Sequence, residues 1–168
     1  MIDQKEYAPF YHTYISKVPA GSRADNFTTT NQQTREFFEQ HPDLDGNYRY
    51  AEGKWTIKEV LMHLIDTEKI MAFRALCIAR GDQTKLPGFD QNQYAEMVDV
   101  SNRTIKDLVD EFTLTRQLTM VTFQHFSEKE LLHIGTASNS PVSVRALAAI
   151  IIGHEMHHMG ILAERYLG

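Results

Sequence analysis

Apolar residues recur every three to four positions over four long stretches of this chain, which is the spacing of an amphipathic helix. The strongest stretch runs from Trp55 to about Arg80. Thr56 and Glu59 form a capping-box pattern at its start, and Gly81 is a natural stop at its end. The period-two alternation that marks half-buried strands is nearly absent. The pattern therefore predicts a helical protein without strands.

Three further helices follow from the same spacing. One covers residues 102–125, and another covers residues 142–166, where Ser140 and Pro141 fit a helix cap and a first-turn proline. The stretch 23–42 has fewer apolar residues, but their spacing is still helical and a proline ends it. Four helices of this length predict an all-α fold of the four-helix-bundle type.

The segments outside these helices are an N-terminal arm, a short helix and a long loop. Residues 6–18 hold several aromatic side chains interrupted by Pro9, and we expect them to form an arm packed along the bundle. Residues 127–132 open with a second capping box. The loop 80–94 after the second helix contains the turn sequence LPGFD, and long loops in compact domains are often functional. We expect a single domain over residues 1–168, with the up-down order of the helices left open.

Composition narrows the class of protein. The chain has 168 residues, of which 42% are hydrophobic and 23% charged, as in ordinary globular domains. A net charge of -5 argues against nucleic-acid binding, and no window approaches a membrane span of 18 apolar residues. The N-terminus lacks the apolar core of a secretory signal. The only cysteine, Cys77, excludes an intramolecular disulfide and is interpreted as a small packed side chain. We therefore expect a cytoplasmic protein that binds neither nucleic acid nor membrane.

Three histidines interrupt the apolar stripe of the last helix. His154 and His158 are four residues apart, so their side chains lie on one helix face, in line with aliphatic residues above and below. His157 lies on a less apolar line and is expected at the edge of the core. Burying an imidazole without a partner costs a few kcal/mol. The pair is therefore either hydrogen-bonded within the core or binds a metal, for which imidazole is the commonest ligand.

A metal needs a third ligand, and we expect it from another helix. His63 is the only histidine in the strongest predicted helix. Asp66 and Thr67 lie three and four residues beyond it, so either is a candidate partner for an imidazole. Asp66 is also a candidate base, with a surface ion pair as the alternative. Glu155 is a weaker candidate base, because it lies about 100° around the helix from His154 and is expected to face solvent.

A site of three histidines leaves coordination positions open, which is typical of catalytic rather than structural metal sites. The metal would lower the pKa of a bound water or thiol, polarise a carbonyl, or do both. Three imidazoles suit Zn²⁺ or Ni²⁺ best, with Fe²⁺ and Mn²⁺ as further options. The sequence does not separate these ions.

Two segments resemble the DinB-like family of bacterial proteins, in the branch grouped with YfiT. The most specific features are Trp55 followed eight residues later by a histidine, the ARGD…LPGFDQ loop, and the motif His-x-x-His-His-x-Gly in the last helix. The resemblance covers nearly the whole chain. It implies a four-helix bundle, usually dimeric, that holds a divalent metal. Carried over by position, the implied ligands are His63, His154 and His158.

The resemblance constrains the site better than the reaction. Characterised relatives include S-transferases and isomerases that use low-molecular-weight thiols, and other members have no known activity. It therefore implies a metal-dependent thiol S-transferase or hydrolase-like enzyme, acting on a small-molecule electrophile with or without a thiol cosubstrate. The alternative is a non-catalytic metal-binding module of a stress response. Many relatives have arginine at the position of Met159, so an anion contact would have to come from Arg74, Arg80 or Arg145, each of which also fits a solvated helix residue.

Overall fold

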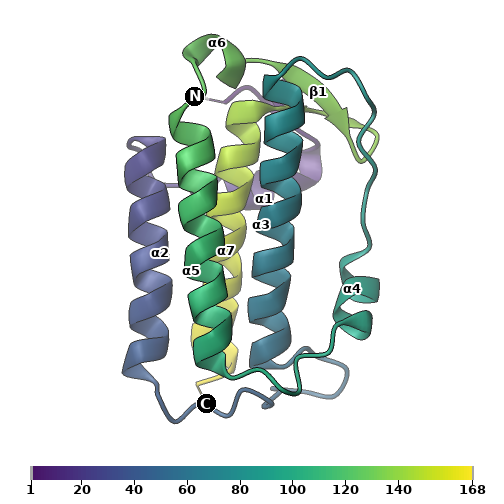
Figure 1. Ribbon diagram of the computed structural model, residues 1–168. Helices are drawn as coiled ribbons and strands as arrows, with labels where there is room; N and C mark the ends of the chain where they lie inside the picture. The colour runs from purple at the N-terminus through teal and green to yellow at the C-terminus, as the bar shows by residue number, and fades with distance from the viewer. Residues whose placement is uncertain (1, 168) are drawn as a thin grey trace.

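Four long helices stand side by side in the computed structural model, which describes residues 2–167 (Figure 1). They are α2 (Arg23–Gln40), α3 (Ile57–Ala79), α5 (Ile105–Gln124) and α7 (Val144–Arg165). The prediction of an all-α four-helix bundle is confirmed. Each helix begins and ends within three residues of its expected bounds. The single domain expected over the whole chain stays a prediction.

The order of the helices is the feature that the sequence left open. In Figure 1, α2 and α7 descend from the end of the bundle that carries the N-terminus, whereas α3 and α5 both rise toward it. Because α3 and α5 run in the same direction, the segment 80–104 has to return along the length of the bundle. It does so on the outer side of α3 and forms the short helix α4 (Gln91–Met97) on the way. The long loop predicted at residues 80–94 is the first part of this returning segment.

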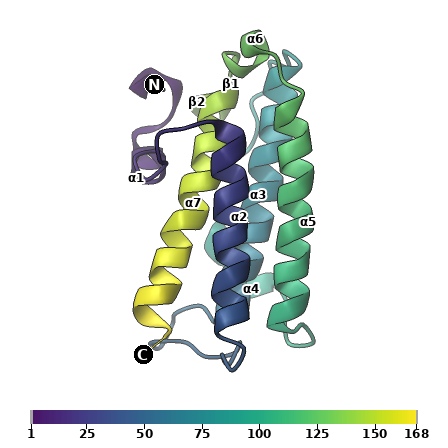
Figure 2. The same cartoon turned by 90° about the vertical axis from the view of Figure 1, so that its left-hand side faces the viewer.

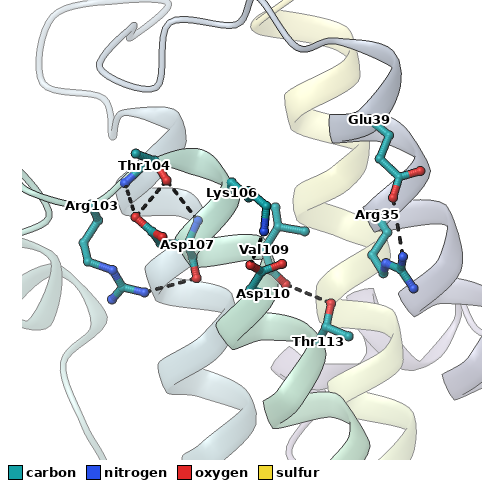
Figure 3. A network of polar contacts seen from close by, with 9 residues as sticks. All are labelled: Arg35, Glu39, Arg103, Thr104, Lys106, Asp107, Val109, Asp110 and Thr113. Carbon is teal, nitrogen blue, oxygen red and sulfur yellow. Dashed lines mark hydrogen bonds and ion pairs between the residues drawn. The ribbon is translucent and has the colours of Figure 1, made fainter.

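Side-chain caps fix where the helices begin. Thr56 and Glu59 form the expected capping box of α3. An equivalent box opens α5, where the Thr104 hydroxyl accepts from the Asp107 N–H and the Asp107 carboxylate accepts from the Thr104 N–H (Figure 3). Figure 3 also shows Arg103 donating to the Asp107 carbonyl. These local bonds satisfy the free N–H groups of the first helical turn, so sequence alone located the helix starts well.

The start of α7 differs from the prediction. Ser140 and Pro141 do not cap it, because they belong to strand β2 (Ser140–Ser143), which pairs antiparallel with β1 (Ile134–Ala137). Ser143 is the N-cap, and its Oγ accepts from the Ala146 N–H at 3.1 Å. The prediction of a protein without strands was therefore wrong. Two strands of four residues are too short to show a clear alternation, and their tight turn carries no glycine to mark it.

The N-terminal arm packs on the outer face of α7, as predicted (Figure 2). It contains η1 (Gln4–Glu6), η2 (Pro9–Tyr11) and α1 (His12–Ile15). A Cβ added at Gly153 would lie 2.0 Å from the Tyr14 carbonyl oxygen, so only glycine lets the two backbones approach this closely. Glu6 anchors the other end of the arm through Arg145, and their hydrogen bonds lower the pKa of Glu6 to about 2.

Helix α7 is the central element of the fold. It packs against α1, α2 and α3, and twelve of its residues, most of them apolar, are buried. Contrary to the sequence expectation, it is long and apolar enough to cross a membrane by composition, with a mean hydropathy of 1.3 over 18 residues. Since 61% of that window is buried inside the bundle, the apolar residues are accounted for by core packing. This central position also means that polar side chains of α7 face other helices.

Candidate metal centre

Three histidines meet between α3 and α7. His63 comes from α3, while His154 and His158 lie one turn apart on α7. One ring nitrogen of each lies within 4.8 Å of those of the other two, and the Nε2 atoms of His63 and His154 are 2.9 Å apart. Among the described residues, no carboxylate or cysteine sulfur joins this group. The structure thus brings together the three residues that the sequence selected, and their role as ligands is a proposal.

Burial keeps these imidazoles neutral. It lowers the pKa of His63 to about 4 and, with repulsion from the neighbouring histidines, that of His158 to about 3. Burial and the same neighbours also lower the pKa of His154 well below its ordinary value. Neutral imidazole is the form that binds metals. The group therefore presents unprotonated ring nitrogens at physiological pH without any acidic residue to compensate a positive charge.

Two neighbours hold the ring of His63 in place. The Oγ1 of Thr67 lies 3.4 Å from the Nδ1 of His63, which leaves Nε2 directed at the other histidines. Trp55 packs on the same ring, with centroids 4.8 Å apart. Of the two candidate partners, it is therefore Thr67 that contacts the imidazole. Asp66 is half-buried in a small cleft beside His63, and burial raises the pKa of its carboxyl group.

Glu155 does not face solvent as expected. Its side chain is 1% exposed and lies on the side of α7 that faces α2 and α5. Its carboxylate accepts from the Thr34 hydroxyl and from the Arg116 guanidinium, both at 2.7 Å. The expected position of Glu155, about 100° around the helix from His154, was correct. Because α7 has other helices on several sides, a side chain in that direction faces a neighbouring helix. Glu155 is thus engaged in a separate cluster and is a poor candidate for a base.

Arg116 is the centre of that second cluster, and sequence reasoning missed it. It is fully buried, and it donates from Nε and Nη2 to the two carboxylate oxygens of Glu68, both at 2.8 Å. A signal was present in the sequence, because Arg116 falls four residues after Phe112 and seven before Phe123, on the apolar stripe of α5. A charged residue on such a stripe indicates a buried ion pair.

A cleft of about 220 Å³ opens beside His154. Its walls come from the N-terminal arm, from α3 and α7, and from the loop and hairpin turn near the end of the bundle. Tyr14 lies edge-on to the rings of His154 and His157, with centroids 5.2 and 5.5 Å away. Burial raises the pKa of Tyr14. His157 is half-buried and outside the cluster, as expected for a residue at the edge of the core.

The loop 80–94 contributes to this cleft through Phe89 and Gln91. Phe89 belongs to the LPGFD turn of this loop, so the turn forms part of the cleft wall. Arg74, expected to be solvated, is instead 2% exposed and donates to the Pro87 carbonyl at 2.7 Å and the Ser138 hydroxyl at 3.2 Å. It therefore ties the loop to the hairpin.

Comparison with known proteins agrees with the resemblance found in the sequence. The family model described as the DinB superfamily matches residues 26–162, which include all three histidines. The chain belongs to the DinB superfamily. One similar solved structure is YfiT from Bacillus subtilis, described as a probable metal-dependent hydrolase with an unusual four-helix bundle topology. It has 12% sequence identity and a TM-score of 0.67, and the match covers 98% of this chain and 90% of that chain.

At this level of identity, the likeness to YfiT shows the fold of this DinB-superfamily chain and leaves its reaction open. No curated protein matches the chain. The function must therefore be inferred from the histidine group and its surroundings.

Proposed function

We propose that this chain is a divalent-metal-dependent enzyme in which His63, His154 and His158 hold the metal. The observation that carries the proposal is the convergence of three neutral ring nitrogens, from two helices, beside an open cleft. The description of the similar YfiT structure as a probable metal-dependent hydrolase supports the same class of activity.

The residues present fit a divalent ion. Three imidazoles without a fourth ligand from the described residues match the donor set of a catalytic site with open positions. Borderline ions such as Zn²⁺ or Ni²⁺ suit this nitrogen set best, followed by Fe²⁺ and Mn²⁺. When bound, the ion would supply Lewis acidity, which lowers the pKa of a water or thiol and polarises a carbonyl.

The chain itself supplies position and shelter. Thr67 orients His63, and Trp55 covers the His63 ring. Tyr14 and Phe89 both line the cleft, so a substrate held there would lie next to His154. Their aromatic rings make part of this wall apolar.

We propose two alternative reactions for this site. The first is hydrolysis of a small electrophile, and the second is transfer of a thiol sulfur to such an electrophile. The second reaction is favoured by the lack of a carboxylate in the histidine group, since a thiol needs a weaker base than water for its activation. A small thiol cosubstrate would then share the cleft with the electrophile. A non-catalytic metal-binding module remains the alternative. The homodimer and the cytoplasmic location expected from the sequence stay predictions.

A reconstitution assay tests this function. The purified chain is loaded with Zn²⁺ or Ni²⁺ and offered 4-nitrophenyl esters, and separately 1-chloro-2,4-dinitrobenzene with glutathione, cysteine or bacillithiol. We expect turnover that chelation abolishes and added metal restores, with loss in His158→Ala and retention in His157→Ala. Turnover that survives chelation contradicts the proposal. A chain that binds metal but turns over nothing in either assay supports the non-catalytic alternative.

A further inference from the structure

We propose that the wall of the cleft beside His154 binds an uncharged aromatic or branched alkyl group of a small substrate. This inference rests on the proposed function, because it assigns the substrate class of that same site. Apart from His154, the side chains that line the cleft share one property, which is that none carries a formal charge. They are Phe10, Tyr11, Tyr14, Thr67, Met71, Phe89, Gln91, Ser138 and Ile150.

The composition of the wall sets what it can bind. Aromatic and aliphatic side chains form most of it, and Thr67, Gln91 and Ser138 offer hydrogen-bonding groups at separate points. A volume of about 220 Å³ accommodates a substituted six-membered ring, since a cavity of about 150 Å³ binds benzene. Phe10 at the rim is 65% exposed, so the cleft is open to solvent on that side.

Two charged groups near the cleft are engaged elsewhere. Arg74 lies behind Phe89 and Ser138, where its Nη2 donates to the Pro87 carbonyl and the Ser138 hydroxyl. Glu155 lies on the side of α7 that faces Arg116. An anionic group held against this wall, away from the proposed metal ligands, would lose hydration without gaining an ion pair, which is unfavourable. A neutral group meets no such penalty.

Two devices hold the walls in place. Gly153 lets the arm backbone lie against α7, which brings Tyr14 over His154. On the other side, Leu86 forms a bridge with Ala137, and Arg74 clamps the same loop, which positions Phe89. The cleft is therefore built from segments far apart in the sequence, as expected for a binding site with a defined shape.

A matched pair of probes tests the charge preference. Acetophenone and benzoate have nearly the same size and shape, but only benzoate is charged. Their binding is followed by the ¹³C-methyl NMR signal of Met71, which lines the cleft, with the exposed Met97 as internal reference. The titrations use the zinc-loaded chain and the same chain after chelation. We expect acetophenone to shift the Met71 signal with at least about tenfold higher affinity than benzoate in the chelated protein.

Two pairs of variants test the walls. Gly153→Ala places a methyl group against the Tyr14 backbone and should weaken acetophenone binding at least about tenfold, whereas Gly160→Ala, with no atom within 4 Å, should not. Since Gly153→Ala could also disturb folding, Phe89→Ala provides a second test. It should weaken binding about threefold to tenfold, with Phe73→Ala, an exposed phenylalanine outside this cleft, as its control.

Benzoate binding as tight as acetophenone binding in the chelated protein overturns the inference, and so does a Met71 signal that neither probe shifts. Both results leave the proposed metal function intact if the chain still binds zinc. Conversely, a chain that binds no zinc but binds acetophenone more tightly than benzoate contradicts the proposed function, and it leaves the inference about the cleft intact. The two failures are therefore distinguishable.

Discussion

Two polar clusters lie inside this bundle, each with residues on α3 and α7, and they differ in the charges of their members. Glu68 and Glu155 meet Arg116, and every charged group there has a partner within hydrogen-bond distance. In the other cluster, ring nitrogens of His63, His154 and His158 face one another, and no carboxylate of the described residues joins them. Burial alone would lower the pKa of Arg116, but the charges of Glu155 and Glu68 raise it. In the histidine cluster, burial and mutual repulsion act in the same direction, toward the neutral form.

The difference separates structure from function within one core. The arginine cluster joins α2, α3, α5 and α7 and leaves no group free for a ligand, so we interpret it as the polar brace of the bundle. The Nε2 atoms of His63 and His154 lie 2.9 Å apart, within hydrogen-bond distance, and no carboxylate of the described residues joins them, so these nitrogens are the groups that a metal would bind. Adjacent residues His154 and Glu155 thus serve different purposes because they point to different sides of α7.

The largest expected effect comes from removing the centre of the arginine cluster. Arg116→Met preserves side-chain volume but leaves Glu68 and Glu155 buried without a cation. We expect a loss of about 3–5 kcal/mol in the free energy of unfolding. Chemical denaturation measures it, with Arg35→Met as control, because Arg35 forms an exposed pair with Glu39 that is worth less than about 1 kcal/mol. An equal loss of unfolding free energy in the two variants would contradict the interpretation of the arginine cluster as the polar brace of the bundle.

The histidine cluster should instead respond to metal. Zinc at about 100 times its dissociation constant should raise the free energy of unfolding by about 3 kcal/mol, because it binds only the folded chain. In His158→Ala the same zinc concentration should add far less, while His157→Ala should behave as wild type. Thermal unfolding with and without zinc measures this. Equal stabilisation of the wild type and His158→Ala would place the metal elsewhere.

Glu155→Gln tests whether the two clusters are independent. The amide retains the shape of the carboxylate but not its charge, and Arg116 keeps its two bonds to Glu68. We expect the free energy of unfolding to fall by about 1–3 kcal/mol with the zinc content unchanged. Metal analysis of the folded variant decides the point. Zinc lost from a folded Glu155→Gln chain would show that the brace and the metal centre act as one unit.

A smaller effect concerns the arm that covers the cleft. Hydrogen bonds from Arg145 lower the pKa of Glu6 to about 2 from an ordinary value of 4.5. The contribution of Glu6 is therefore complete above pH 4.5 and is lost as the pH falls toward 2. Since Arg145 is 33% exposed, solvent screening leaves about 1–2 kcal/mol. We expect Glu6→Gln to be less stable than wild type at pH 7 and equal to it near pH 2, as measured by urea denaturation.

Local signals in the sequence predicted most of the fold. Caps such as Thr56 and Ser127 act within one helical turn, so they can be predicted without knowledge of the tertiary structure. The histidine trio was also predictable, because His154 and His158 share a helix face. The parallel direction of α3 and α5 was not predictable, since it depends on how the long segment 80–104 runs back along the bundle.

Two of the errors share a cause, which is contact between residues distant in sequence. Glu155 and Arg74 looked solvated because their partners lie on other segments, 39 residues away in the case of Glu155 and Arg116. Helical periodicity indicates which residues share a helix face, but it does not indicate which part of the protein packs against that face.

The most direct test of the central claim is the metal content of the purified chain and its histidine variants. After zinc loading and dialysis, we expect about one zinc ion per wild-type chain and the same in His157→Ala. His63→Ala, His154→Ala and His158→Ala should each lose zinc while they remain folded by circular dichroism. A wild-type chain without zinc, or three variants that retain the wild-type content, would contradict the account.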